Sequence, residues 1–139
     1  MKNKFFLRAL AAGLVLAVAV SLAGCSGIKE SDVSYAGPVA DNILAGINDK
    51  DYREFSRDFS DTLKQGIPED SFNTQIVDWF GALGELKEKS FAAAQNVVEN
   101  NVNYTAVVYK VKYEKGDVQL QITFSNDDEK KLVEGLWYK

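Results

Sequence analysis

Apolar residues recur every three or four positions between residues 38 and 83, a spacing that predicts amphipathic helices. A first helix is expected to begin near Pro38, because proline suits the first helical turn. A second follows the capping-box-like residues 51–54, and a third runs from Pro68 towards Gly84. The three apolar stripes consist of Val39, Ile43 and Ile47; of Tyr52, Phe55, Phe59 and Leu63; and of Phe72, Ile76, Trp79, Phe80 and Leu83.

Beyond Gly84 the apolar period changes to two, which predicts strands with one buried face. Residues 104–113 and 118–125 alternate in this way, and the links that follow them are short and rich in turn-forming residues. Such strands are expected to pair as antiparallel hairpins. A last strand is expected at residues 131–138. The segment 85–99 is an earlier element, and its three successive alanines leave helix and strand both open.

The start of the chain has a different character from the rest. Lys2, Lys4 and Arg8 are its only charged residues, and an uninterrupted apolar run follows at residues 9–20. A membrane-spanning helix needs about 20 apolar residues, so this shorter run is typical of an export signal. Directly behind it stand Leu22, Ala23, Gly24 and Cys25, and Cys25 is the only cysteine of the chain.

This LAGC sequence resembles the lipobox of prokaryotic lipoproteins. The resemblance implies a diacylglyceryl group on the sulfur of Cys25 and cleavage just before it, and two acyl chains suffice for stable anchoring. We therefore expect a signal peptide at residues 1–24, a lipidated N-terminus and tether at 25–35, and a domain at 36–139. The protein would be lipid-anchored at the extracytoplasmic face of the cell membrane. The alternatives are a buried cysteine and a plain signal peptide cut at Ala23.

Net charge narrows the choice of partners. The 115 residues from Cys25 onward would keep 20 acidic and 13 basic side chains, a net charge of −7. Nucleic-acid binding is disfavoured, because neutralising phosphates requires a basic surface. The expected partners are the membrane, through Cys25, and a small ligand or an envelope protein.

Helices followed by strands predict an α+β domain. We expect three N-terminal helices packed on a curved antiparallel sheet of about four strands. This order, together with the apolar pattern of residues 40–60 and the closing residues 134–138, resembles a family of small exported domains of unknown function. These domains look like members of the nuclear transport factor 2-like superfamily, which implies a cone of curved sheet and helices.

That superfamily includes isomerases and dehydratases that hold an acid-base pair in a cone-shaped pocket. This chain has no histidine, so carboxylates and tyrosines are the remaining acid-base groups. Asp58, Asp61 and Asp78 lie beside helical apolar stripes, and Tyr109 and Tyr113 lie on an apolar strand face. A carboxylate inside a pocket can act as a base, but solvated carboxylates on outer helix faces fit the same spacing better.

Aromatic residues suggest a candidate pocket made by Phe72, Trp79, Tyr109 and Trp137, although aromatic stripes at such spacings more often belong to the core. No cofactor or metal is expected: residues 126–129 are acidic but lack the ligand spacing and glycine of a calcium loop. The sequence thus favours a non-catalytic domain that binds a ligand or partner. The alternatives are a small-molecule isomerase, dehydratase or hydrolase that uses a pocket Asp with Tyr, and a structural role in which the outer sheet face dimerises.

Overall fold

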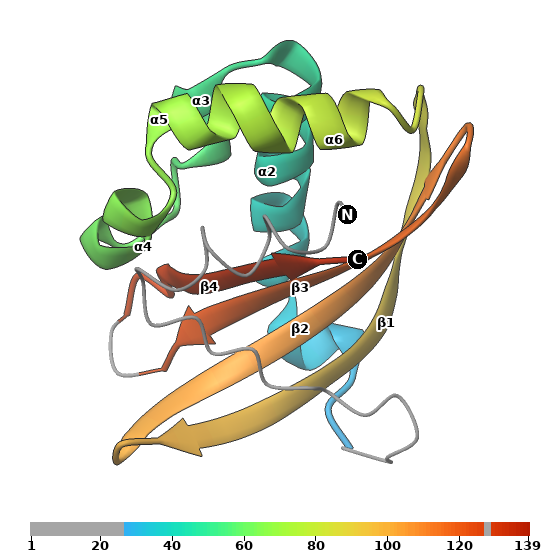
Figure 1. Cartoon of the computed structure of the whole chain (residues 1–139). Helices are drawn as coiled ribbons and strands as arrows, with labels where there is room; N and C mark the ends of the chain where they lie inside the picture. Colours follow the sequence, from blue (N-terminus) through green and yellow to red (C-terminus); the bar gives the residue numbers. More distant parts are fainter. Residues whose placement is uncertain (1–26, 127–128) are drawn as a thin grey trace.

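The computed structural model describes residues 27–126 and 129–139, which form helices packed on one antiparallel sheet (Figure 1). The predicted α+β class is confirmed. The helical segments are η1 (Glu30–Val33), α2 (Ala36–Asp49), α3 (Tyr52–Phe55), α4 (Asp61–Gly66), α5 (Glu69–Ser71), η2 (Phe72–Ile76) and α6 (Val77–Gly81). The strands are β1 (Leu86–Glu99), β2 (Val102–Tyr113), β3 (Gly116–Ser125) and β4 (Val133–Tyr138). No helix of the described residues is long and apolar enough to cross a membrane.

The sheet has the strand order β1-β2-β3-β4, and each neighbouring pair is antiparallel. Residues 85–99, which the sequence left between helix and strand, provide the edge strand β1. It joins β2 through Asn100 and Asn101, whose φ values of 50° and 62° are typical of a two-residue hairpin turn. A register shift between Phe91 and Ala93 marks a bulge at the alanine run.

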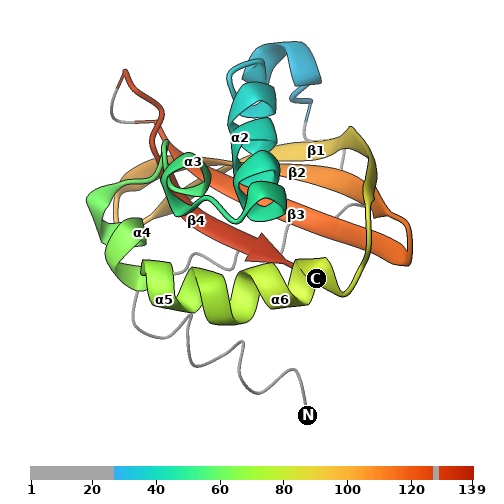
Figure 2. The same ribbon diagram turned by 90° about the horizontal axis from the view of Figure 1, so that it is seen from above.

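The first predicted helix is present as α2 and crosses the inner face of the sheet (Figure 2). It begins two residues before Pro38, which still lies in the first turn, where no backbone N–H is needed for the helix. The helix ends at Lys50, which adopts the left-handed conformation with a φ of 56°. Its buried stripe comprises Ala36, Ala40, Ile43, Leu44, Gly46 and Ile47.

The second predicted helix is interrupted in the structure, so the expectation of three N-terminal helices is only roughly matched. After α3 the chain extends, and Phe59 forms an isolated parallel bridge with Val133 of β4. The N–H of Ser60 donates to the Val133 carbonyl at 2.9 Å, and the Val133 N–H donates to the Asp58 carbonyl at 2.8 Å. Ser60 then caps α4 by accepting a hydrogen bond from the Leu63 N–H.

The third predicted helix is continuous from α5 through η2 to α6, with Pro68 as its N-cap. Its central segment, η2, is a π-helical stretch. Together with α2, α3 and α4 it makes about four helices in the described part of the chain. Phe72, Ile76, Val77 and Phe80 are buried and complete the core against α2 and the sheet.

The inner sheet face is buried as predicted, with residues such as Val107, Tyr109, Leu120 and Ile122 in the core. The opposite, outer face carries the polar side chains of Lys110, Lys112 and Gln119, but part of it is buried. Ala106 and Val108 of this face are fully buried but do not belong to the core cluster, and Gln121 and Thr123 are buried as well.

Residue 46 shows how closely α2 approaches its neighbour. A Cβ built on Gly46 would lie 2.6 Å from the Cα and 2.8 Å from the Cβ of Phe55. We predict that Gly46→Ala lowers the free energy of unfolding by about 1–3 kcal/mol, because α2 and α3 would have to separate. Urea denaturation measures this.

The matched control is Gly81→Ala, since a Cβ on Gly81 meets no atom within 4 Å. We expect Gly81→Ala to be neutral or to stabilise by up to about 1 kcal/mol. Equal urea midpoints for the two variants would contradict the packing argument.

Candidate functional site

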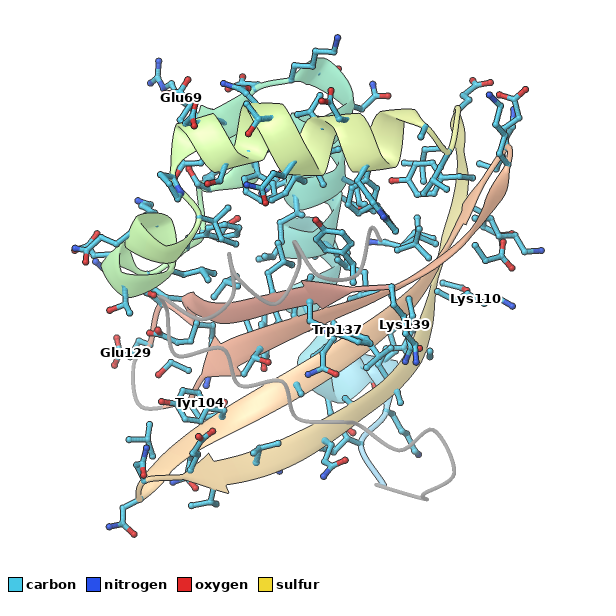
Figure 3. All side chains as sticks on the ribbon, in the orientation of Figure 1. Glu69, Tyr104, Lys110, Glu129, Trp137 and Lys139 are labelled. Atoms are coloured by element: carbon cyan, nitrogen blue, oxygen red, sulfur yellow. The ribbon has the colours of Figure 1, made fainter. Side chains whose placement is uncertain are left out.

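The four residues of the predicted aromatic pocket lie in separate parts of the domain. Phe72 is in the core, with its ring centroid 4.6 Å from that of Phe55. Trp79 packs against Tyr138 at 4.8 Å. Trp137 lies on the outer sheet face (Figure 3), and only Tyr109 lines a cavity near the first turn of α2.

That cavity, called the Tyr109 pocket below, has a volume of about 360 Å³. It forms where η1 and the start of α2 pass over β2. Its lining residues are Glu30, Ser31, Val33, Ser34, Gly37 and Tyr109. The Tyr109 hydroxyl lies close to the first turn of α2, because a Cβ built on Gly37 would be 3.9 Å from its oxygen, an ordinary contact distance.

Lys89 of β1 contacts two of the residues that line the pocket, Gly37 and Tyr109. Its Nζ donates to the Gly37 carbonyl at 2.9 Å, forms an ion pair with Asp41 at 2.6 Å, and lies 4.9 Å from the centroid of the Tyr109 ring. The lysine side chain is only 18% exposed. Lys89 therefore fixes the first turn of α2 against the sheet.

The Tyr109 hydroxyl is the chemically unusual group of this pocket. The residue is 1% exposed, yet its hydroxyl makes no hydrogen bond within the described part of the chain. Burial raises the pKa of Tyr109 to about 12, and the carboxylates of Glu30 and Asp41 add to the increase. The phenol is therefore protonated at physiological pH and can donate a hydrogen bond to an oxygen in the pocket.

The sequence pattern points to Tyr109 but not to Lys89. Lys89 lies opposite Val111 on the core side of the sheet, an unusual place for a lysine. The sequence could not reveal this, because residues 85–99 fit a helix as well as a strand and because the bulge in β1 changes which residues share a face.

The carboxylates proposed as acid-base groups do not enter a pocket. Asp61 and Asp78 are exposed, and Asp58 is half-buried and accepts a hydrogen bond from Asn42 at 3.2 Å. None of the described Asp or Glu residues is buried. Within residues 27–126 and 129–139 there is also no group of three metal-ligating side chains. Asp127 and Asp128 of the acidic loop lie outside the described residues.

Residues 40–136 match the family described as Protein of unknown function (DUF3887). The chain belongs to this family. Lys89 and Tyr109 fall within the matched region of the DUF3887 domain, whereas the other residues that line the pocket precede it. The comparison with curated proteins gave no match.

The DUF3887 domain is also similar to the NMR structure of a protein from Ruminococcus gnavus ATCC 29149. The two share 22% sequence identity over 80% of this chain and 91% of that chain, with a TM-score of 0.60. At this identity the similarity shows a common fold.

The buried tyrosines predict how stability depends on alkaline pH. Burial raises the pKa of both Tyr109 and Tyr113 from 10.0 to about 12, so the folded state holds these protons more tightly than the unfolded state. Their contribution is fully present below pH 10 and is lost as the pH rises through 12. We expect the free energy of unfolding, measured with urea, to fall across this window.

Tyr109→Phe removes one of the two titrating hydroxyls, so its free energy of unfolding should fall less steeply between pH 10 and 12 than that of the wild type. The control is Tyr104→Phe, on the outer face. If wild type and Tyr109→Phe lost stability equally between pH 10 and 12, Tyr109 would not have the raised pKa.

Proposed function

We propose that this DUF3887 protein is a lipoprotein, anchored through Cys25 at the extracytoplasmic face of the cell membrane, whose domain binds a small molecule in the Tyr109 pocket. The basic start, the short apolar run and the LAGC sequence support the anchor. The arrangement of helices over one curved sheet supports membership of the nuclear transport factor 2-like superfamily (Figure 1).

The observation that carries the binding proposal is the buried Tyr109 hydroxyl, which forms no hydrogen bond with any of the described residues. A buried polar group that forms no hydrogen bond costs about 1–3 kcal/mol, so most such groups are satisfied by protein, water or ligand. Here the hydroxyl meets a cavity of about 360 Å³, the lower end of the range for small-molecule sites. A ligand that offers a carbonyl or carboxylate oxygen would complete the hydrogen bond.

Binding without catalysis fits the pocket better than an acid-base reaction. An isomerase, dehydratase or hydrolase of the kind considered above needs a carboxylate held inside the cavity. Glu30 lines the pocket but is exposed, and Asp41 is 67% exposed and paired with Lys89. Neither carboxylate has the desolvated setting that makes a strong general base.

Ligand binding can be tested by thermal unfolding against a panel of small carboxylates, ketones and amides. A compound that binds only the folded state raises the midpoint temperature of unfolding by mass action. At a concentration of a hundred times its Kd, it adds about 2.7 kcal/mol to the free energy of unfolding. We expect at least one compound of the panel to stabilise the wild type and to have no effect on Tyr109→Phe.

Tyr109→Phe keeps the ring and removes only the hydroxyl, so without ligand it should be as stable as the wild type or up to about 1 kcal/mol more stable. Trp137→Phe is the control, because Trp137 lies on the other sheet face. A compound that stabilises Tyr109→Phe as much as the wild type would place the binding site elsewhere.

The anchor is tested by Cys25→Ser in the native host, or in a host that processes its signal. We expect the wild type to sediment with membranes and to incorporate labelled fatty acid, and Cys25→Ser to lose the label. A protein that never carries the label would refute the lipoprotein assignment.

A further inference from the structure

The anchor proposed above would be very short. Ile28 already packs against the core and Val33 is buried, so residues 28–35 of the expected tether belong to the folded domain. Only Ser26 and Gly27 separate Cys25 from Ile28. Three residues span about 10 Å at full extension, so the domain must lie directly on the bilayer.

The described part of the chain begins at one edge of the sheet. The first described residues and η1 run beside the edge strand β1, as both views of the ribbon show (Figures 1 and 2). A domain held at this edge can turn its helices or its outer sheet face towards the membrane.

The centre of the outer face is apolar. Ala106 and Val108 lie there, on the side of the sheet opposite the face on which the described helices pack (Figure 2). Tyr104 and Trp137 lie half-buried around them (Figure 3). After cleavage before Cys25, four residues of the chain would remain outside the described part: Cys25, Ser26, Asp127 and Asp128. So few residues cannot cover a sheet face.

Two lysine side chains, Lys110 and Lys139, lie at one end of the outer face. A groove of about 350 Å³ is lined by Ala92, Val108, Lys110 and Lys139, among others. Lys139 lies over the ring of Trp137, 5.4 Å from its centroid (Figure 3). Lys110 pairs with Asp117 at 3.7 Å but remains more than half exposed, so its charge is available to a second anion.

Charge is also divided unequally between the two halves of the domain. Residues 30–85, which form the helices, carry twelve acidic and four basic side chains, a net charge of −8. Residues 86–139, which form the sheet, carry eight of each. An anionic bilayer repels the helical half more strongly and leaves the sheet half as the side that faces it.

We propose that the outer sheet face docks on the anionic lipid surface, with Tyr104 and Trp137 at the headgroup level and with Lys110 and Lys139 among the phosphates. Aromatic rings favour this depth of a bilayer, and lysines extend their ammonium groups to the interface. This orientation rests on the proposed lipid anchor, and it leaves the Tyr109 pocket on the side away from the docked face.

The two tryptophans of the chain allow a direct test, because Trp137 is on the outer face and Trp79 is in α6. Lipidated Trp79→Phe and Trp137→Phe are reconstituted in vesicles of phosphatidylcholine and phosphatidylglycerol, with or without brominated acyl chains. In Trp79→Phe, where Trp137 emits, we expect the brominated chains to quench most of the fluorescence. In Trp137→Phe, where Trp79 emits, we expect the fluorescence to stay unchanged.

Flotation of the same vesicles separates the two proposals. If the wild type does not float, or floats no better than Cys25→Ser, the anchor is wrong. If it floats and Trp137 is quenched no more than Trp79, the anchor stands and the docking proposal is overturned. A Trp137 that is unquenched in a protein that sediments as a dimer would show that a second copy covers the face.

Charge reversal gives an independent test. Lys110→Glu combined with Lys139→Glu should weaken docking by at least about tenfold and restore Trp137 emission. Arg57→Glu combined with Lys64→Glu makes the same change of charge on the helical side and should have no such effect. Equal quenching of Trp137 in both double variants would contradict docking through the two lysines.

Discussion

The contact of α2 with the inner sheet face determines where the other elements lie. One stripe of α2 is buried against the core, and Gly46 lets α3 approach near its end. At its beginning, Lys89 fixes the helix to β1 through the Gly37 carbonyl and Asp41. Because the apolar faces of a sheet and a helix must be buried together, the described helices gather on one side of the sheet.

The Tyr109 pocket exists because the covering of the inner face is incomplete at the start of α2. The chain changes there from η1 to α2, and a short helical turn fills less space than a continuous helix. The phenol of Tyr109 then lies beside a cavity instead of packed side chains. A phenylalanine would pack equally well and would bury no hydroxyl that lacks a hydrogen bond among the described residues, so stability alone does not account for a tyrosine at this position.

In our proposals the two faces of the sheet therefore have different binding partners. The inner face supports the helices and a pocket for a small molecule, and the outer face rests on lipid. The docking proposal depends on the division of charge, since acidic side chains are concentrated in the helical half. A domain anchored within a few residues of its core is orientated by its own surface, because the link is too short to hold it away from the membrane.

The sequence by itself determined the local features of this protein. The period of its apolar residues predicted α2, the helix that follows Pro68 and the strands after residue 100, because local side-chain spacing decides which face is buried. It could not predict the break near Phe59, since the same spacing fits a helix and only the backbone hydrogen bonds to Val133 of β4 favour the extended form. Nor could it bring Lys89 to Gly37 across 52 positions, because that contact depends on the bulge in β1 and on the path of α2. Tertiary packing also decided that the candidate aromatic residues lie apart and that one of them, Tyr109, meets a cavity.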